Sequence, residues 1–216
     1  MDAQFWINAW NEGRTGFHQQ VFHDKLLKYF PELSPQEGQK VLVPLCGKSK
    51  DLLWLAHLKL KVNGFELHQN AVEAFFNENA LSPIKKDQDK EFNSYNFQNI
   101  TLYCGDFFKL HVKNFYDLIY DRASLVALPA SMRKEYAQII KQCLKIGGKY
   151  LLIVYEYDQS KLEGPPFSVE TKEIHDLYED HFSIRLVESK RPDQKGPRFD
   201  TLEELTEKVY ILEKVR

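Results

Sequence analysis

Four residues of types that bind small organic molecules follow short apolar runs of the sequence: Gly47, Glu66, Asp106 and Arg122. A glycine lets the backbone approach a ligand closely. Glu66 comes about 20 residues after Gly47, and its carboxylate can accept hydrogen bonds from both hydroxyls of a ribose. An arginine guanidinium can pair with a ligand carboxylate or polarise an anionic group. The four residues together predict a site for a nucleoside-like ligand.

Two phosphate-binding motifs resemble the loop around Gly47, but both fail. Gly47-Lys48-Ser49 looks like the end of a P-loop, yet that motif requires a glycine where Leu42 stands. The dinucleotide fingerprint requires several glycines, and Gly47 is the only one in this loop. Without a pyrophosphate cradle, an adenosyl group that lacks phosphates fits best. S-Adenosylmethionine is such a molecule.

Alternating apolar runs and helical patterns predict the elements that position these residues. We expect a doubly wound α/β sheet, mostly parallel and covered by helices, with ligands at the carboxyl ends of its strands. The polar stretch 83–98 is expected to be a surface insertion. The predicted strands are 40–45, 61–66, 101–104, 116–121, 150–155, 184–187 and 209–212, and the predicted helices are 5–10, 19–30, 51–60, 71–79, 132–144 and 174–181.

Composition limits the class of protein. The 216 residues predict a single domain, with a net charge of −2 and no basic stripe, so nucleic acid is not an expected partner. No apolar run approaches the roughly 20 residues that a membrane span needs. The three cysteines, Cys46, Cys104 and Cys143, are far apart and form no CxxC pair, which disfavours a disulfide framework or a metal site and favours the cytoplasm. The absence of a long apolar surface stripe favours a monomer.

Aromatic side chains near the N-terminus are candidates for ligand contact. The indole of Trp10 could attract a sulfonium cation from a mobile N-terminal lid, although core packing is the alternative. Phe17 could stack on a flat acceptor or pack against the second helix. His68 is expected on the surface. Asp106 could reach an adenine edge or cap a turn, and Arg122 could instead pair with the neighbouring Asp121.

Several segments together resemble the bacterial branch of the thiopurine S-methyltransferase family. The matching segments are 41–49, 64–66, 121–129 and 164–169, with Trp6, Trp10 and Gly16-Phe17-His18 at the N-terminus. The resemblance implies a Rossmann-like sheet of seven strands with an antiparallel last strand (36–216), plus an N-terminal helical lid (1–35). It implies that Trp10, Leu45, Glu66 and Arg122 bind S-adenosylmethionine. It also implies a C-terminal arginine that faces the substrate, for which Arg198 is the first candidate and Arg191 the second.

The expected reaction is methyl transfer to an aromatic or heterocyclic thiol such as a thiopurine. Such a transfer depends on alignment of the reactants more than on a base, so no catalytic residue is assigned, and Pro166 is expected to form part of a rigid acceptor wall. Selenium or tellurium species and other small thiols are alternative acceptors. A nicotinamide-dependent reductase and a non-catalytic adenosyl-binding module are alternatives of other classes.

Overall fold

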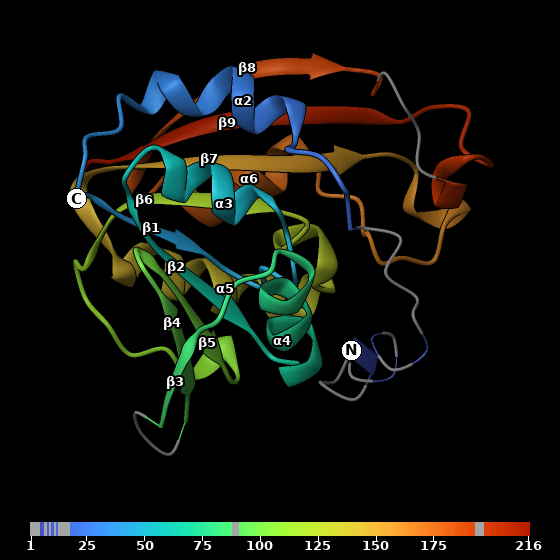
Figure 1. Ribbon diagram of the computed structural model, residues 1–216. Coiled ribbons are helices and arrows are strands. Elements are labelled where there is room, and N and C mark those ends of the chain that lie inside the picture. Colours follow the sequence, from blue (N-terminus) through green and yellow to red (C-terminus); the bar gives the residue numbers. More distant parts are fainter. Residues whose placement is uncertain are drawn as a thin grey trace. The chain divides into compact units, whose positions relative to one another are not determined.

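The computed structural model describes residues 5, 6, 8, 10, 12, 18–87, 91–192 and 197–216 (Figure 1). The chain divides into two compact units, Met1–Leu110 and His111–Arg216. Each unit contains part of a sheet and helices that pack on it. The single-domain organisation stays a prediction.

The first unit is built on a sheet with the strand order β3-β4-β5-β2-β1. Strands β1, β2 and β5 run parallel, and most of their apolar residues are fully buried, as expected for strands covered on both faces. The elements are α2 (Asp24–Tyr29), η1 (Phe30–Leu33), β1 (Lys40–Val43), α3 (Asp51–His57), β2 (Lys61–Glu66), α4 (Gln69–Glu78), β3 (Ile84–Asp87), β4 (Asn93–Phe97), β5 (Ile100–Cys104) and η2 (Phe107–Lys109).

The stretch 83–98, which was expected as a surface insertion, forms two strands, β3 and β4, that the sequence did not predict. They pair as an antiparallel hairpin, and β4 continues the sheet antiparallel to β5 (Figure 1). Tyr95 and Ser94 of β4 are buried, whereas β3 at the sheet edge has the sequence Ile84-Lys85-Lys86-Asp87. Charged residues are common on edge strands, which makes such strands resemble loops in sequence. With these two strands, the described sheet segments contain nine strands rather than seven.

The second predicted helix is shorter than expected. Residues 24–29 form α2, which begins after His23, whose side chain accepts a hydrogen bond from the backbone N–H of Lys25. The chain then tightens into η1, which contains Pro31. Of the first predicted helix, Phe5, Trp6, Asn8 and Trp10 are described and are helical.

The second unit is built on the strand order β6-β7-β9-β8. Strands β6 and β7 are parallel, whereas β9 is antiparallel to both β7 and β8, which confirms the predicted antiparallel last strand (Figure 1). The elements are β6 (Tyr116–Arg122), η3 (Leu125–Ala127), α5 (Ala130–Cys143), β7 (Leu144–Glu156), η4 (Gln159–Lys161), α6 (Thr171–Tyr178), β8 (Phe182–Lys190), η5 (Pro197–Phe199) and β9 (Thr206–Lys214).

None of the helices in the described ranges is long and apolar enough to cross a membrane.

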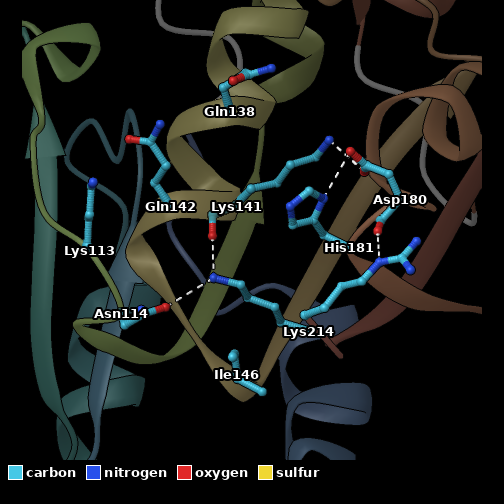
Figure 2. Close-up of a pocket in the computed structure, with 10 residues that line it drawn as sticks. Lys113, Asn114, Gln138, Lys141, Gln142, Ile146, Asp180, His181 and Lys214 are labelled. Atoms are coloured by element: carbon cyan, nitrogen blue, oxygen red, sulfur yellow. Dashed lines mark hydrogen bonds and ion pairs between the residues drawn. The ribbon is translucent and has the colours of Figure 1, made fainter.

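A buried lysine caps the C-terminal end of α5. The Lys214 ammonium donates to the backbone oxygens of Lys141 (2.6 Å) and Leu144 (2.7 Å) and to Oδ1 of Asn114 (3.2 Å). Figure 2 shows the contacts with Lys141 and Asn114. The last carbonyls of a helix lack partners within the helix, so a buried cation there satisfies them. All three N–H groups of Lys214 are thereby used within the protein.

The same lysine lies in a cavity of about 420 Å³ near the amino ends of β6 and β7. Two other basic side chains that line this cavity, Lys141 and Arg216, also have partners, and Figure 2 shows the contact of Lys141 with Asp180. Lys141 pairs with Asp180 at 2.7 Å, and Arg216 donates to the backbone oxygen of Asp180. We interpret the cavity as a structural feature.

Replacing Lys214 with methionine is expected to destabilise the protein by about 2–4 kcal/mol, because the α5 carbonyls lose their buried donor. Lys113→Met is the matched control, since Lys113 lines the same cavity but is exposed, and it should change stability by less than about 0.5 kcal/mol. Urea unfolding of both variants measures the difference. Equal stabilities would show that the cap contributes nothing.

Candidate functional site

The loop after β1 has an unusual backbone. Leu45 has φ of 44° and Gly47 has φ of 53°, so both lie in the left-handed region. Non-glycine residues rarely adopt this conformation, and those that do cluster at ligand-binding positions. The backbone N–H of Cys46 donates to the oxygen of Phe65 at 2.8 Å, which ties the loop to β2.

Glu66 ends β2 and is held by the backbone around it. Its Oε2 accepts from the N–H of Gly47 at 2.9 Å, and its Oε1 accepts from the N–H of His68 at 2.8 Å. The side chain is only 6% exposed, and burial raises its pKa to about 7, although the N–H donors oppose this rise. The carboxylate is therefore not a solvated group at the strand end. Each oxygen retains capacity for a second donor.

Asp106 follows β5, next to the end of β2. Its Oδ1 accepts from the N–H of Phe108 at 3.0 Å and thereby caps η2, which is the turn-capping alternative from the sequence. The neighbouring Gly105 donates its N–H to the backbone oxygen of Glu66 at 2.9 Å. A contact between Asp106 and an adenine stays a prediction.

Trp10 and His68 lie against each other in the first unit. Their rings are stacked, with centroids 6.4 Å apart and an interplanar angle of 22°. His68 is only 8% exposed and precedes α4 as its N-cap residue, so the expectation that it lies on the surface is wrong. Its position two residues after Glu66, where a strand turns into a helix, is the signal that could have revealed this.

In the second unit, Arg122 ends β6 and is half-buried. Its neighbour Asp121 is fully buried and accepts hydrogen bonds from the hydroxyls of Tyr136 (2.6 Å) and Tyr150 (2.8 Å). Successive strand residues point to opposite faces, so Arg122 faces away from this network. Ala123 then turns the chain with φ of 61°.

The predicted acceptor wall is fixed by contacts within the second unit. The hydroxyl of Tyr157 donates to the backbone oxygen of Pro166 at 2.5 Å, and the N–H of Phe167 donates to the oxygen of Val126 at 2.6 Å. Nη2 of Arg198 donates to the oxygen of Gly164 at 3.1 Å. Two residues predicted to contact the acceptor, Pro166 and Arg198, therefore belong to one cluster.

Two other residues are also predicted to contact the acceptor, Arg191 and Phe17. Arg191 is exposed and lies just beyond β8. Phe17 lies outside the described residues.

Sequence reasoning missed Arg133, which holds the backbone beside the predicted acceptor wall. This buried guanidinium donates to the backbone oxygens of Leu128 (2.9 Å) and Ser168 (3.0 Å) and to Glu173 (2.6 Å). It links the loop after η3 to the segment that follows Phe167. The sequence around Arg133 on α5 does not indicate these partners, which lie elsewhere in the chain.

Solved structures share this fold. A 1,6-didemethyltoxoflavin-N1-methyltransferase from Burkholderia thailandensis, solved with S-adenosylhomocysteine, matches with a TM-score of 0.68 and 15% identity, covering 99% of this chain and 87% of that one. A TehB-like SAM-dependent methyltransferase from Corynebacterium glutamicum matches with a TM-score of 0.59 and 15% identity over 98% and 95% of the two chains. The fold is that of the class I S-adenosylmethionine-dependent methyltransferases, as predicted.

Sequence comparison gives the family. The family described as thiopurine S-methyltransferase (TPMT) matches residues 1–215. A thiopurine S-methyltransferase from Bordetella parapertussis is 44% identical over 219 residues, which cover 100% of both chains. One from Vibrio cholerae serotype O1 is 46% identical over 177 residues, covering 82% of this chain and 81% of the relative. The chain belongs to the thiopurine S-methyltransferase family and is a methyltransferase, which is not the class of the nicotinamide-dependent alternative.

Proposed function

We propose that this protein binds S-adenosylmethionine at the carboxyl end of β2 and methylates the sulfur of an aromatic or heterocyclic thiol, such as a thiopurine. The observation that carries the proposal is the buried Glu66 carboxylate, which two backbone N–H groups hold at 2.9 and 2.8 Å. The names of the family and of its relatives support the thiol acceptor.

The residues at this strand end fit an adenosyl group. Each oxygen of Glu66 can accept one ribose hydroxyl in addition to its backbone donor. Leu45 and Gly47 turn the backbone sharply after β1, and the N–H of Gly47 thereby lies against the carboxylate of Glu66. Trp10 and Arg122 are assigned to the cofactor from the family resemblance. When bound, S-adenosylmethionine supplies an electrophilic methyl group on a sulfonium, which an indole face attracts by about 0.5–2 kcal/mol.

The chain contributes alignment of the reactants in this mechanism. The leaving group is neutral and a thiolate is already a strong nucleophile, so in-line geometry is the main requirement, worth about 7–11 kcal/mol. The wall around Pro166 orients the acceptor ring, and Arg133 fixes the backbone of that wall. Arg122 and Arg198 stabilise the anionic form of the thiol, because a guanidinium pairs well with a delocalised anion.

We propose further that the protein acts on small molecules, as a monomer, in the cytoplasm. The three cysteines, Cys46, Cys104 and Cys143, are all free thiols. Unpaired cysteines are typical of a reducing compartment. The net charge of −2 does not favour nucleic acid as a partner.

The acceptor is tested by comparing kcat/KM for a heterocyclic thiol, its oxygen isostere, a small aliphatic thiol, and selenite or tellurite. We expect the heterocyclic thiol to exceed the others by about 100-fold. Arg198→Met should lower kcat/KM about 10-fold or more, since a charged contact is lost. Arg191→Met, which removes the second candidate, should have little effect. Preference for the aliphatic thiol or the inorganic anions would overturn the proposed acceptor.

A further inference from the structure

One buried nitrogen at the proposed cofactor site lacks a partner. Among the residues that the structure describes, Nδ1 of His68 is buried and has no hydrogen-bond partner. Burial also lowers the pKa of this imidazole, which favours its neutral form. A buried polar atom without a partner costs about 1–3 kcal/mol, so an atom left in this state within a proposed site indicates that a ligand completes it.

The position of His68 indicates which part of a ligand it would meet. Its backbone N–H donates to Oε1 of Glu66 at 2.8 Å, so the residue adjoins the carboxylate that is proposed to hold the ribose. Its ring packs on Trp10, which is also assigned to the cofactor. Although His68 is the N-cap residue of α4, its side chain makes no capping hydrogen bond. The imidazole nitrogen therefore has no structural task in the helix.

A sugar hydroxyl is the chemical group that suits this nitrogen. In neutral imidazole, Nδ1 is either a donor or an acceptor, depending on the tautomer. A hydroxyl can serve as the partner in both cases, because it donates and accepts. We propose that His68 is a further cofactor-positioning residue, and that its Nδ1 forms a hydrogen bond with a ribose hydroxyl of the adenosyl group beside Glu66. This inference rests on the proposed binding of S-adenosylmethionine.

The test uses calorimetric binding of S-adenosylhomocysteine to two variants of the full chain. His68→Phe keeps a flat ring against Trp10 but removes the nitrogen, and it should weaken binding about 5- to 20-fold. His68→Asn places an amide near the position of Nδ1 and should recover part of that loss. His57→Phe is the matched control, because His57 is an exposed histidine at the end of α3, and its variant should bind like the wild type.

Analogues that lack the ribose 2′- or 3′-hydroxyl separate a direct contact from a structural effect. If His68 contacts one hydroxyl, the loss caused by His68→Phe should shrink for the analogue that lacks this hydroxyl and persist for the other. Equal losses for all three ligands, or no loss at all, would overturn the inference. Both variants should fold, because Nδ1 of His68 has no hydrogen-bond partner among the described residues and the side chain does not cap α4. Failure of the wild type to bind S-adenosylhomocysteine would instead contradict the proposed function.

Discussion

Replacing Glu66 with alanine is expected to weaken binding of S-adenosylhomocysteine about 100-fold or more. The carboxylate is proposed to accept two ribose hydroxyls, and each hydrogen bond to a charged group is worth about 1.5–3 kcal/mol. The variant also releases the N–H groups of Gly47 and His68, which shape the loop. Calorimetric titration at about pH 8 measures the effect.

Glu78→Ala is the control for this experiment. Glu78 pairs with Lys48 of the same loop at 2.5 Å, but this pair lies near the surface and contributes little. We expect the affinity of Glu78→Ala to be within about twofold of the wild type. Similar losses in both variants would mean that the loop, rather than the Glu66 carboxylate, determines binding.

The pH dependence of binding should also reflect Glu66. Its pKa is about 7 in the free protein, and only the ionised carboxylate accepts hydrogen bonds at both oxygens without a competing proton. The affinity for S-adenosylhomocysteine should therefore fall up to about 10-fold between about pH 8 and pH 6. The affinity of Glu66→Gln should not show this fall with pH. If the affinities of both proteins changed equally between about pH 8 and pH 6, the pH dependence would not come from Glu66.

The same pKa predicts a cost in stability for the free protein. Because the folded value of about 7 lies above the ordinary value of 4.5, the folded chain binds more protons in this range. Stability should therefore fall as the pH rises from about 4.5 to about 7. A ligand that donates hydrogen bonds to the carboxylate offsets this cost.

Replacing Asp121 with alanine is expected to destabilise the protein by about 3–5 kcal/mol. The carboxylate accepts from the hydroxyls of Tyr136 and Tyr150 and from the N–H of Leu125 at 3.2 Å, and all of these donors would be left buried without it. Burial raises the pKa of Asp121, while the donors oppose the rise. Urea unfolding measures the change, provided that the dependence of the unfolding free energy on urea concentration is the same in both proteins.

Asp117→Ala provides a matched control on the same strand. Asp117 pairs with Lys145 at 2.6 Å, but the lysine is 43% exposed and the aspartate 20% exposed. Exposed ion pairs contribute about 0–1 kcal/mol, so this variant should remain close to the wild type. An equal loss of stability in both variants would show that the hydrogen bonds of Asp121 with Tyr136 and Tyr150 do not stabilise β6 specifically.

Local patterns predicted most of the sheet and the residues at its strand ends. The buried runs at β1, β2, β5, β6 and β7 are short, apolar and bounded by turn residues, so their strand character is visible in sequence. The hairpin of β3 and β4 was missed because its outer strand, Ile84–Asp87, carries edge-strand charges. Polar residues in a strand at the edge resemble a loop when the partner strand is unknown.

The contacts that depend on distant partners were not predictable from local patterns. Arg133 bonds to residues up to 40 positions away, and Lys214 reaches Asn114 across 100 positions. His68 was expected on the surface, because its burial depends on residues that are distant in the sequence, such as Trp10. Sequence spacing identified Glu66, but the folded chain was needed to show that two backbone donors orient it.

Calorimetric titration of the wild-type protein with S-adenosylhomocysteine, and separately with NADPH, tests the central claim most directly. The account predicts micromolar binding of S-adenosylhomocysteine with one site per chain and no binding of NADPH. Binding of NADPH, or no binding of S-adenosylhomocysteine, would contradict the assignment of the β2 strand end to an adenosyl group without phosphates.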